Sequence, residues 1–418
     1  MNGFEADTGS IAWMLTSSAL VLFMTPGLAL FYGGMVRAKN VLNMLMKNFI
    51  SMGIITILWV LVGYSLAFGG DAPFIGNFDH VGLRGLVGGH PANAIHGVAG
   101  VPDSVIMVFQ MMFAIITPAL IAGAVAERIK FSAWVVFISI WSLVVYSPMA
   151  HWVWDFTATP EGVTGGFIAS TIGAIDFAGG LVVHINAGAA ALALILALGP
   201  RLGWRHTIIR PHNLPLTLLG TGILWFGWFG FNSGSALTSG ELAAWAFVNT
   251  HIAAAVAATV WALVEKLKTG APTTLGVASG AVAGLVAITP AAGFVTPVGS
   301  IIIGAAAGLI CYLALEIKFR FNFDDSLDVI AVHLVGGILG SLLLGFLAST
   351  EINTFAGGVA QFVTQLESVG LALVFSCSVS YALAMAIKAT IGLRVTEDQE
   401  RRGLDITLHD EQAYALSE

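Results

Sequence analysis

Long apolar stretches separated by short polar segments dominate the sequence. Each stretch is close to twenty residues long, the length of a helix that crosses the ~30 Å hydrocarbon core of a bilayer. Strands of outer-membrane barrels alternate apolar and polar residues over about ten positions instead, and no such alternation is present. The pattern therefore predicts an all-α polytopic membrane protein with eleven transmembrane helices, at about 10–34, 48–68, 102–125, 131–154, 168–198, 214–235, 241–264, 273–290, 297–317, 328–348 and 366–391.

The polar segments between the stretches predict an orientation. Lys and Arg accumulate in short cytoplasmic loops. With the N-terminus outside and eleven alternating spans, every basic residue except Arg84 falls on the inner side: Arg37, Lys39, Lys47, Arg128, Lys130, Arg201, Arg205, Arg210, Lys266, Lys268, Lys318, Arg320, Lys388, Arg394, Arg401 and Arg402. This segregation predicts N-out/C-in. Eleven spans also permit two inverted five-helix halves plus one extra helix.

Composition agrees with a membrane protein and excludes other classes. Hydrophobic residues make up 57% of the chain and charged residues 10%, against about 25% charged in soluble domains. The net charge of −7 is not accompanied by a basic stripe, so we expect no nucleic-acid partner. Cys311 and Cys377 lie in apolar spans and are interpreted as packing residues. No Lys or Arg precedes Arg37, so the first span does not resemble a signal peptide.

Two histidines lie within predicted spans, where ionisable groups are costly and often functional. At 1.5 Å of rise per residue, His184 lies about 12 Å from Asp176 and His333 about 8 Å from Asp328, from opposite faces. A neutral imidazole donates and accepts a hydrogen bond, which suits a proton relay or a polar step in a dry pore. Interhelical hydrogen bonding without further function is an equal alternative. For Asp176 and Asp328 the sequence leaves two roles open: attracting a cation, or capping the N-terminus of a helix.

Aromatic residues gather in the third, fourth and sixth spans, and polar residues follow them. Aromatic faces attract cations, although a belt or packing role is the commoner explanation for any single ring. Rings beside hydroxyl groups suit a small hydrogen-bonding cation such as ammonium or a methylamine. The residues concerned are Phe109, Phe113, Trp152, Trp154, Trp225, Trp228, Phe229 and Phe231, with Asn232, Ser233 and Ser235.

Motifs of soluble enzymes are absent from the sequence: there is no P-loop, no HExxH and no nucleophile elbow with a triad. We therefore expect no enzyme activity, no cofactor and no bound metal. An intramembrane enzyme remains a minor alternative.

One long segment, DFAGGLVVHINAGAAALALILALGPR (176–201), resembles the signature of the Amt/Mep/Rh ammonium transporter family. Further stretches agree with the Amt branch: PGLALFYGGMVRAKN (26–40), GAVAERIKFSA (123–133), GWFGFNSGSA (227–236), AFVNT (246–250), ITPAAGFV (288–295), DDSLDVIAVHLVGGILG (324–340) and GLRVTEDQERRGLD (392–405). The resemblance covers nearly the whole chain.

The resemblance implies a role for each matching residue. His184 and His333 are similar to the family's hydrogen-bonded twin histidines in the pore, and Phe113 and Phe231 to its outer gate. Trp154, Ser235, Phe113 and Phe109 resemble the outer cation site, and Asp176 the structural acid beside it. The implied function is ammonium transport: the outer site recruits NH4⁺, which is deprotonated, and NH3 crosses the pore while the proton is relayed separately.

The resemblance also implies an assembly and a location. The family fold is a homotrimer with one pore per subunit in the cytoplasmic membrane. Residues 1–391 are then the transporter domain and 392–418 a cytoplasmic regulatory tail, with a PII-type nitrogen regulator as a possible partner. Three alternatives stay open: proton-coupled transport, a passive NH3 channel, and an ammonium receptor that signals through the tail. Acceptance of methylammonium is also open.

Overall fold

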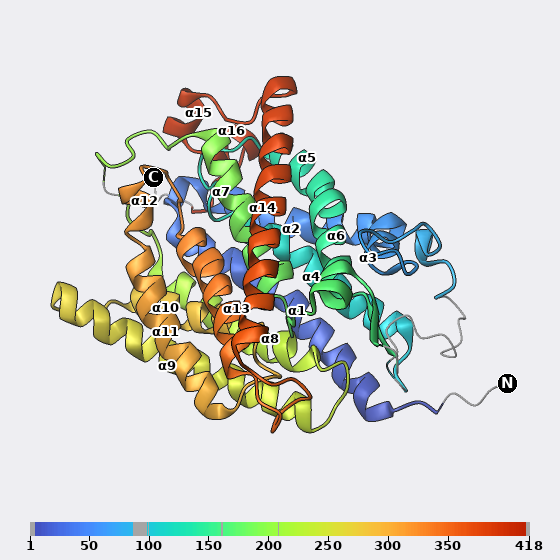
Figure 1. Ribbon diagram of the computed structural model, residues 1–418. Helices are drawn as coiled ribbons and strands as arrows, with labels where there is room; N and C mark the ends of the chain where they lie inside the picture. The colour runs from blue at the N-terminus through green and yellow to red at the C-terminus, as the bar shows by residue number, and fades with distance from the viewer. Residues whose placement is uncertain (1–4, 87–97, 99, 160–161, 208, 415–418) are drawn as a thin grey trace.

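The computed structural model describes residues 5–86, 98, 100–159, 162–207 and 209–414. Within these ranges, ten helices are long and apolar enough to cross a membrane. Five of them are continuous α-helices: α1 (Thr8–Met35), α4 (Asp103–Ile121), α8 (Leu214–Gly234), α9 (Glu241–Thr269) and α14 (Val359–Thr390). The chain is therefore a bundle of membrane-length helices (Figure 1).

The other five long helices are composite. Ala38–Phe68 joins η1 (Ala38–Asn40), α2 (Val41–Leu58), η2 (Trp59–Gly63) and α3 (Tyr64–Phe68); Phe131–Trp154 joins α5 (Phe131–Trp141), η5 (Ser142–Tyr146) and α6 (Ser147–Trp154). The remaining three are η7 (Gly180–Ile185) with α7 (Asn186–Leu198), α11 (Pro297–Ala314) with α12 (Ile317–Arg320), and η8 (Ile330–Leu334) with α13 (Val335–Leu347). η2, η5, η7 and η8 are π-helical turns, which occur often at functional sites.

Shorter elements complete the described chain. α10 (Thr274–Ile288) is apolar but has only 15 residues, and it occupies the position of the eighth predicted span. The count of eleven spans and the orientation therefore stay predictions. Strands β1 (Phe156–Thr159) and β2 (Gly162–Gly165) pair antiparallel, and the other elements are η3 (Val81–Leu83), η6 (Ile168–Ile172), α15 (Glu397–Arg402) and α16 (Leu404–His409).

Three of the predicted spans differ from the structure. The helix predicted at 48–68 begins ten residues earlier, and Lys47 lies inside it, buried, with its carbonyl accepting the Trp134 indole N–H at 3.2 Å. The last span begins at Val359 instead of 366. The span predicted at 168–198 is interrupted between Ile172 and Gly180, because Gly173 and Gly179 adopt positive φ angles of 81° and 116°.

Small residues allow the helices to approach closely. α1 packs along α8, α9 lies against α10 and α11, and α14 against α7 and α13. A Cβ added at Gly220 would lie 2.3 Å from the backbone nitrogen of Phe31, so α1 and α8 touch backbone to backbone. Buried side chains fill the bundle interior, and many large apolar residues on its outer faces are exposed.

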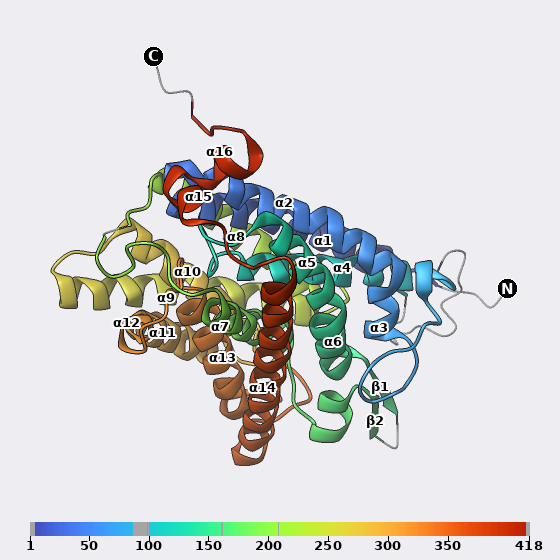
Figure 2. The same cartoon turned by 90° about the horizontal axis from the view of Figure 1, so that it is seen from above.

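Helices α15 and α16 lie together at one end of the bundle, here called the tail end (Figures 1 and 2). The Asp405 carboxylate on α16 accepts the backbone N–H groups of Leu42 at 3.0 Å and Asn43 at 2.8 Å, and so caps the first turn of α2. The ring of His409 lies 5.0 Å from that of Phe131, at the start of α5. The tail is therefore bound to the bundle.

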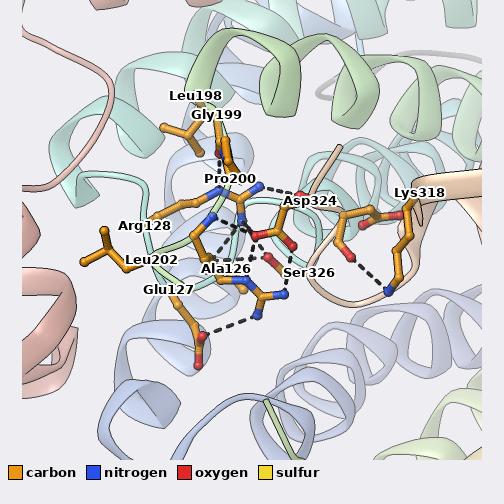
Figure 3. Close-up of polar contacts among 12 residues, drawn as sticks. Ala126, Glu127, Arg128, Leu198, Gly199, Pro200, Leu202, Lys318, Asp324 and Ser326 are labelled. Carbon is orange, nitrogen blue, oxygen red and sulfur yellow. Dashed lines mark hydrogen bonds and ion pairs between the residues drawn. The ribbon is translucent and has the colours of Figure 1, made fainter. Parts of the chain in front are cut away.

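A buried ion network joins the connectors at the tail end. Arg201 contacts Asp324 through Nε at 2.8 Å and Glu127 through Nη1 at 3.3 Å. Arg128 donates to the Gly199 carbonyl at 2.8 Å and to Ser326 Oγ at 2.6 Å (Figure 3). Burial would raise the pKa of Glu127, but Arg201 and Arg37 outweigh it and hold the pKa below its usual value. The connectors between four helix pairs are thus tied together.

Candidate functional site

The two predicted pore histidines meet in the interior of the bundle. His184 lies in η7 and His333 in η8, and their Nδ1 atoms are 3.2 Å apart. Both side chains are buried, and the rings lie 5.3 Å apart between centroids at an angle of 22°. Because two nitrogens share this hydrogen bond, one imidazole donates and the other accepts. The tautomers of the two rings are therefore coupled.

η7 and η8 run toward each other from opposite ends of the bundle. α7, which follows η7, ends where Gly199 accepts from Arg128 at the tail end, and η8 begins beside the same network. The depths estimated from the helical rise per residue did not decide whether the two histidines meet. They do so because each helix carries its histidine in a π-helical turn close to its own start.

Asp176 caps the turn that carries His184. Its carboxylate accepts the backbone N–H groups of Gly179 at 2.8 Å, Gly180 at 2.7 Å, Leu181 at 2.7 Å and Val182 at 3.3 Å. These are the unpaired donors of a helix start, and a carboxylate suits them. Of the two roles considered for Asp176, the contacts are those of a cap.

Asp328 does not play the corresponding role at the tail end. Its carboxylate contacts Lys318 Nζ at 2.5 Å. The cap of η8 is Asp325, whose Oδ2 accepts the Ile330 N–H at 2.7 Å. The sequence contains the signal, because Asp325 precedes His333 by eight residues, as Asp176 precedes His184.

Aromatic rings in tilted and edge-on contact form a continuous series that reaches the histidines, here called the ring stack. Phe113 lies 4.3 Å from Phe231 between centroids, and Phe231 lies 6.2 Å from His184. Phe109 and Trp154 pack on Phe113 at 4.9 and 5.5 Å. The stack thus runs from Trp154, at the end of the bundle opposite the tail, down to the histidine pair.

Ser235 ends α8 beside this stack. Its hydroxyl donates to the Phe231 carbonyl at 2.8 Å, and its side chain is half-buried. A Cβ added at the preceding Gly234 would lie 2.7 Å from the ring of Phe109, so this end of α8 lies against Phe109. The four residues predicted for an outer cation site, Phe109, Phe113, Trp154 and Ser235, therefore come from α4, α6 and α8 and lie around the same ring stack.

Trp228 is part of the site, although the sequence offered no reason to separate it from the other aromatic residues. Its ring stacks on His184 at 5.5 Å and 19°, and its indole N–H donates to Thr289 Oγ1 at 2.9 Å. The spacing of three residues between Trp228 and Phe231 places both on one face of α8, and this is the signal that was available. The two rings form one wall beside His184.

Two cavities adjoin the histidines. An apolar cavity of ≈ 10 Å³ is lined by His184, His333, Trp228 and Phe231, among others. A volume of about 10–15 Å³ holds one water-sized molecule. A second cavity of ≈ 110 Å³ lies toward the tail end, lined by His333, Tyr32, Trp261, Glu265 and Asp328 among others. Two cavities of different volume therefore lie next to the pair.

In the described part of the chain, no three His, Cys, Asp or Glu side chains gather as a metal site would need. The polar groups of the site are instead two imidazoles, one carboxylate used as a cap and one hydroxyl. Such a site suits a small hydrogen-bonding molecule and a proton.

Comparisons with known proteins agree with this geometry. The family model described as Ammonium Transporter Family matches residues 12–414. An ammonium transporter of Mycobacterium tuberculosis is 50% identical over 98% of this chain and 90% of its own length, and ammonium transporter Amt1 of Archaeoglobus fulgidus is 45% identical over 97% and 99%. The crystal structure of Candida albicans Mep2 superposes with a TM-score of 0.86 at 34% identity, covering 94% of this chain and 88% of that one. The chain therefore belongs to the Ammonium Transporter Family, a family of multi-pass membrane transporters.

Proposed function

We propose that this protein recruits NH4⁺ at the outer site formed by Phe109, Phe113, Trp154 and Ser235, deprotonates it, and conducts NH3 past the Phe113–Phe231 gate. His184 and His333 relay the released proton separately toward the cytoplasm. The observation that carries this proposal is the ring stack that ends on a hydrogen-bonded histidine pair beside a cavity of ≈ 10 Å³. The cavity suits a single small molecule, and the pair is the polar group that it meets.

Desolvation explains why the cargo crosses the pore as a neutral molecule. A bare cation in an apolar cavity loses its hydration, and few polar groups replace it. Ammonium avoids this cost by giving up its proton, which passes to the His184–His333 relay, because the ammonia that remains is neutral. Potassium has no neutral form and is excluded. The rings at the outer site attract the cation at about 0.5–2 kcal/mol each before this step.

The proposed location is the cytoplasmic membrane, with residues 1–391 as the transporter and the bound tail, 392–418, on the cytoplasmic side. A PII-type regulator is the proposed partner of the tail, which presents exposed charged side chains on α15.

The proposed assembly is a homotrimer. Its support is His251 on the outer surface of α9, about ten residues or 15 Å inside the helix, where its ring contacts Trp225 at 5.5 Å. A polar side chain facing lipid at this depth is costly, and a neighbouring subunit removes that cost.

A second function, ammonium sensing, is supported by one comparison. A solved structure titled "Sensor Amt Protein" superposes with a TM-score of 0.88 at 29% identity, covering 96% of this chain and 98% of that chain. A sensor and a transporter differ in whether cargo and charge cross the membrane.

Transient currents from purified protein in liposomes on a solid-supported membrane separate these functions. Ammonium and then potassium pulses are applied, with protein-free liposomes as the control. We expect a sustained charge movement with ammonium alone. Uptake of ammonia seen by an internal pH dye without current would instead establish a neutral channel, and absence of both would favour the sensor.

A further inference from the structure

The tail end of the histidine pair repeats the arrangement at its opposite end. Asp176 precedes His184 by eight residues and caps η7, whereas Asp325 precedes His333 by eight residues and caps η8. Ile330, the residue that Asp325 caps, precedes His333 by three residues, about 4.5 Å of helix rise. One carboxyl group therefore lies close to each end of the pair.

The two carboxyl groups differ in how completely they are bonded. Both oxygens of Asp176 accept backbone N–H groups. Asp325 uses Oδ2 for Ile330, and its Oδ1 has no hydrogen-bond partner among the described residues, although the side chain is only 1% exposed. A buried oxygen in this state favours the protonated carboxyl over the carboxylate.

Charged groups on three elements surround Asp325. Asp328 follows it in the same connector and contacts Lys318 of α12, whose Nζ also lies 3.4 Å from the Asp325 carbonyl oxygen. Arg128, from the connector before α5, interacts with its charge, and the neighbouring Asp324 is already paired with Arg201. Burial and then Asp328 raise the pKa of Asp325 to about 6, while Lys318 and the N–H groups of Ile330 and Val329 oppose the rise.

We propose that Asp325 is a positioning residue that sets, from the cytoplasmic side, the positive charge that the histidine pair can carry. Its Oδ2 holds the turn that presents His333, and its Oδ1, unpartnered among the described residues, is the atom that takes up or releases a proton. When Asp325 is ionised, its negative charge near the start of η8 favours an imidazolium at His333; when it is protonated, that support is lost. This inference rests on the proposed proton relay.

The sign of the expected pH dependence follows directly. Above a pH of about 6 on the tail side the carboxylate is present and proton relay is supported; below it the neutral acid predominates. As the pH on the tail side is lowered, the ammonium-evoked current of the wild type should therefore fall, with an inflection near this pH. The proton gradient alone changes the current monotonically, without an inflection.

The test uses liposomes that contain the protein in one orientation, which protease access to the tail verifies. Only the pH of the compartment that the tail faces is varied. Asp325→Asn keeps an oxygen that accepts from Ile330 but does not titrate. We expect its current to fall about tenfold, with no inflection, while uptake of neutral ammonia continues.

Two further variants shift the inflection without removing Asp325. Asp328→Asn removes a negative neighbour and should move the inflection to lower pH, whereas Lys318→Met removes a positive one and should move it to higher pH. A wild-type inflection that persists in Asp325→Asn, or that neither neighbour shifts, would overturn the inference. Absence of any current from the wild type would instead contradict the proposed relay itself.

Discussion

The indole N–H of Trp154 donates to the backbone carbonyl of Asp176 at 3.0 Å. This bond ties the last ring of the outer stack to the residue that caps the turn carrying His184. The Trp154 ring also contacts Phe113, and the two rings meet edge-on at 85°. The proposed outer cation site and the histidine pair are thus linked through the backbone as well as through the rings.

Replacing Trp154 tests the outer site. Trp154→Leu removes both the π-face and the hydrogen bond to Asp176, so the site should bind ammonium more weakly. A loss of about 0.5–2 kcal/mol corresponds to an increase of about twofold to thirtyfold in the ammonium concentration that gives half-maximal current. Concentration series of transient currents measure this shift.

Trp245→Leu is the matched control for this experiment. Trp245 lies near the start of α9, at the same end of the bundle, and its indole contacts Glu241 at 3.4 Å. Its replacement should leave the half-maximal concentration unchanged. Equal shifts in both variants would mean that general damage, and not the outer site, causes the effect.

Removal of one histidine tests the relay. In His184→Ala, His333 Nδ1 loses its partner and the polar step in the pore is broken. We expect ammonium-evoked current to disappear, or potassium exclusion to fail if water enters the vacated volume. His206→Ala, in an exposed connector, is the control. Wild-type current together with intact potassium exclusion in His184→Ala would contradict the proposed role.

Gly188 tests how closely η8 must approach α7. A Cβ at this position would lie 2.6 Å from Leu334 Cβ and 2.8 Å from its backbone nitrogen, directly after His333. Gly188→Ala should therefore destabilise the protein by about 1–3 kcal/mol and reduce ammonium current by displacing His333. The melting temperature in detergent and the current report the two effects.

Gly222→Ala provides the comparison, because a Cβ there meets nothing within 4 Å. An alanine in a helix interior is favoured over glycine by about 1 kcal/mol, so the melting temperature should stay the same or rise. A fall in melting temperature as large as that of Gly188→Ala would show that the packing contact is not the cause.

The cap from the tail is tested at Asp405. Asp405→Ala leaves the N–H groups of Leu42 and Asn43 without their acceptor, at a cost of about 1 kcal/mol. The tail should bind less tightly and be cut faster by protease. Asp398→Ala, which removes only an exposed contact to Arg402 at 3.6 Å, should be cut at the wild-type rate. Equal rates for both variants would exclude a docking role for Asp405.

Much of the bundle was predictable, because apolar stretches of membrane length mark their own helices. Prediction failed where polar residues are buried by tertiary contacts. Lys47 and its neighbours were predicted to lie in a connector. They lie in a helix, because the bound tail and Trp134 cover this part of α2. The interruption before η7 was also missed, since only the positive φ angles of Gly173 and Gly179 reveal it.

The residues of the candidate site were predictable, but their arrangement was not. The resemblance named His184, His333 and the rings, whereas no spacing within one helix fixes a distance between two helices. Trp228 was named only as one of eight aromatic residues, and Asp325 was overlooked, because their contacts with His184 and η8 cross from one segment to another. Their roles in transport stay proposals.

Because the histidines share one hydrogen bond, each proton that passes along the proposed relay leaves both rings in the opposite tautomer. A proton that enters on one ring and leaves from the other reverses which Nδ1 donates, so the pair ends each passage in the mirror image of its starting state. The next proton in the same direction must wait until the donor is restored. The ring of His184 packs on Trp228 and is hydrogen-bonded edge to edge with His333, so both contacts oppose a flip of this ring. Restoring the original donor is therefore a step of the proposed cycle that is distinct from the passage of ammonia.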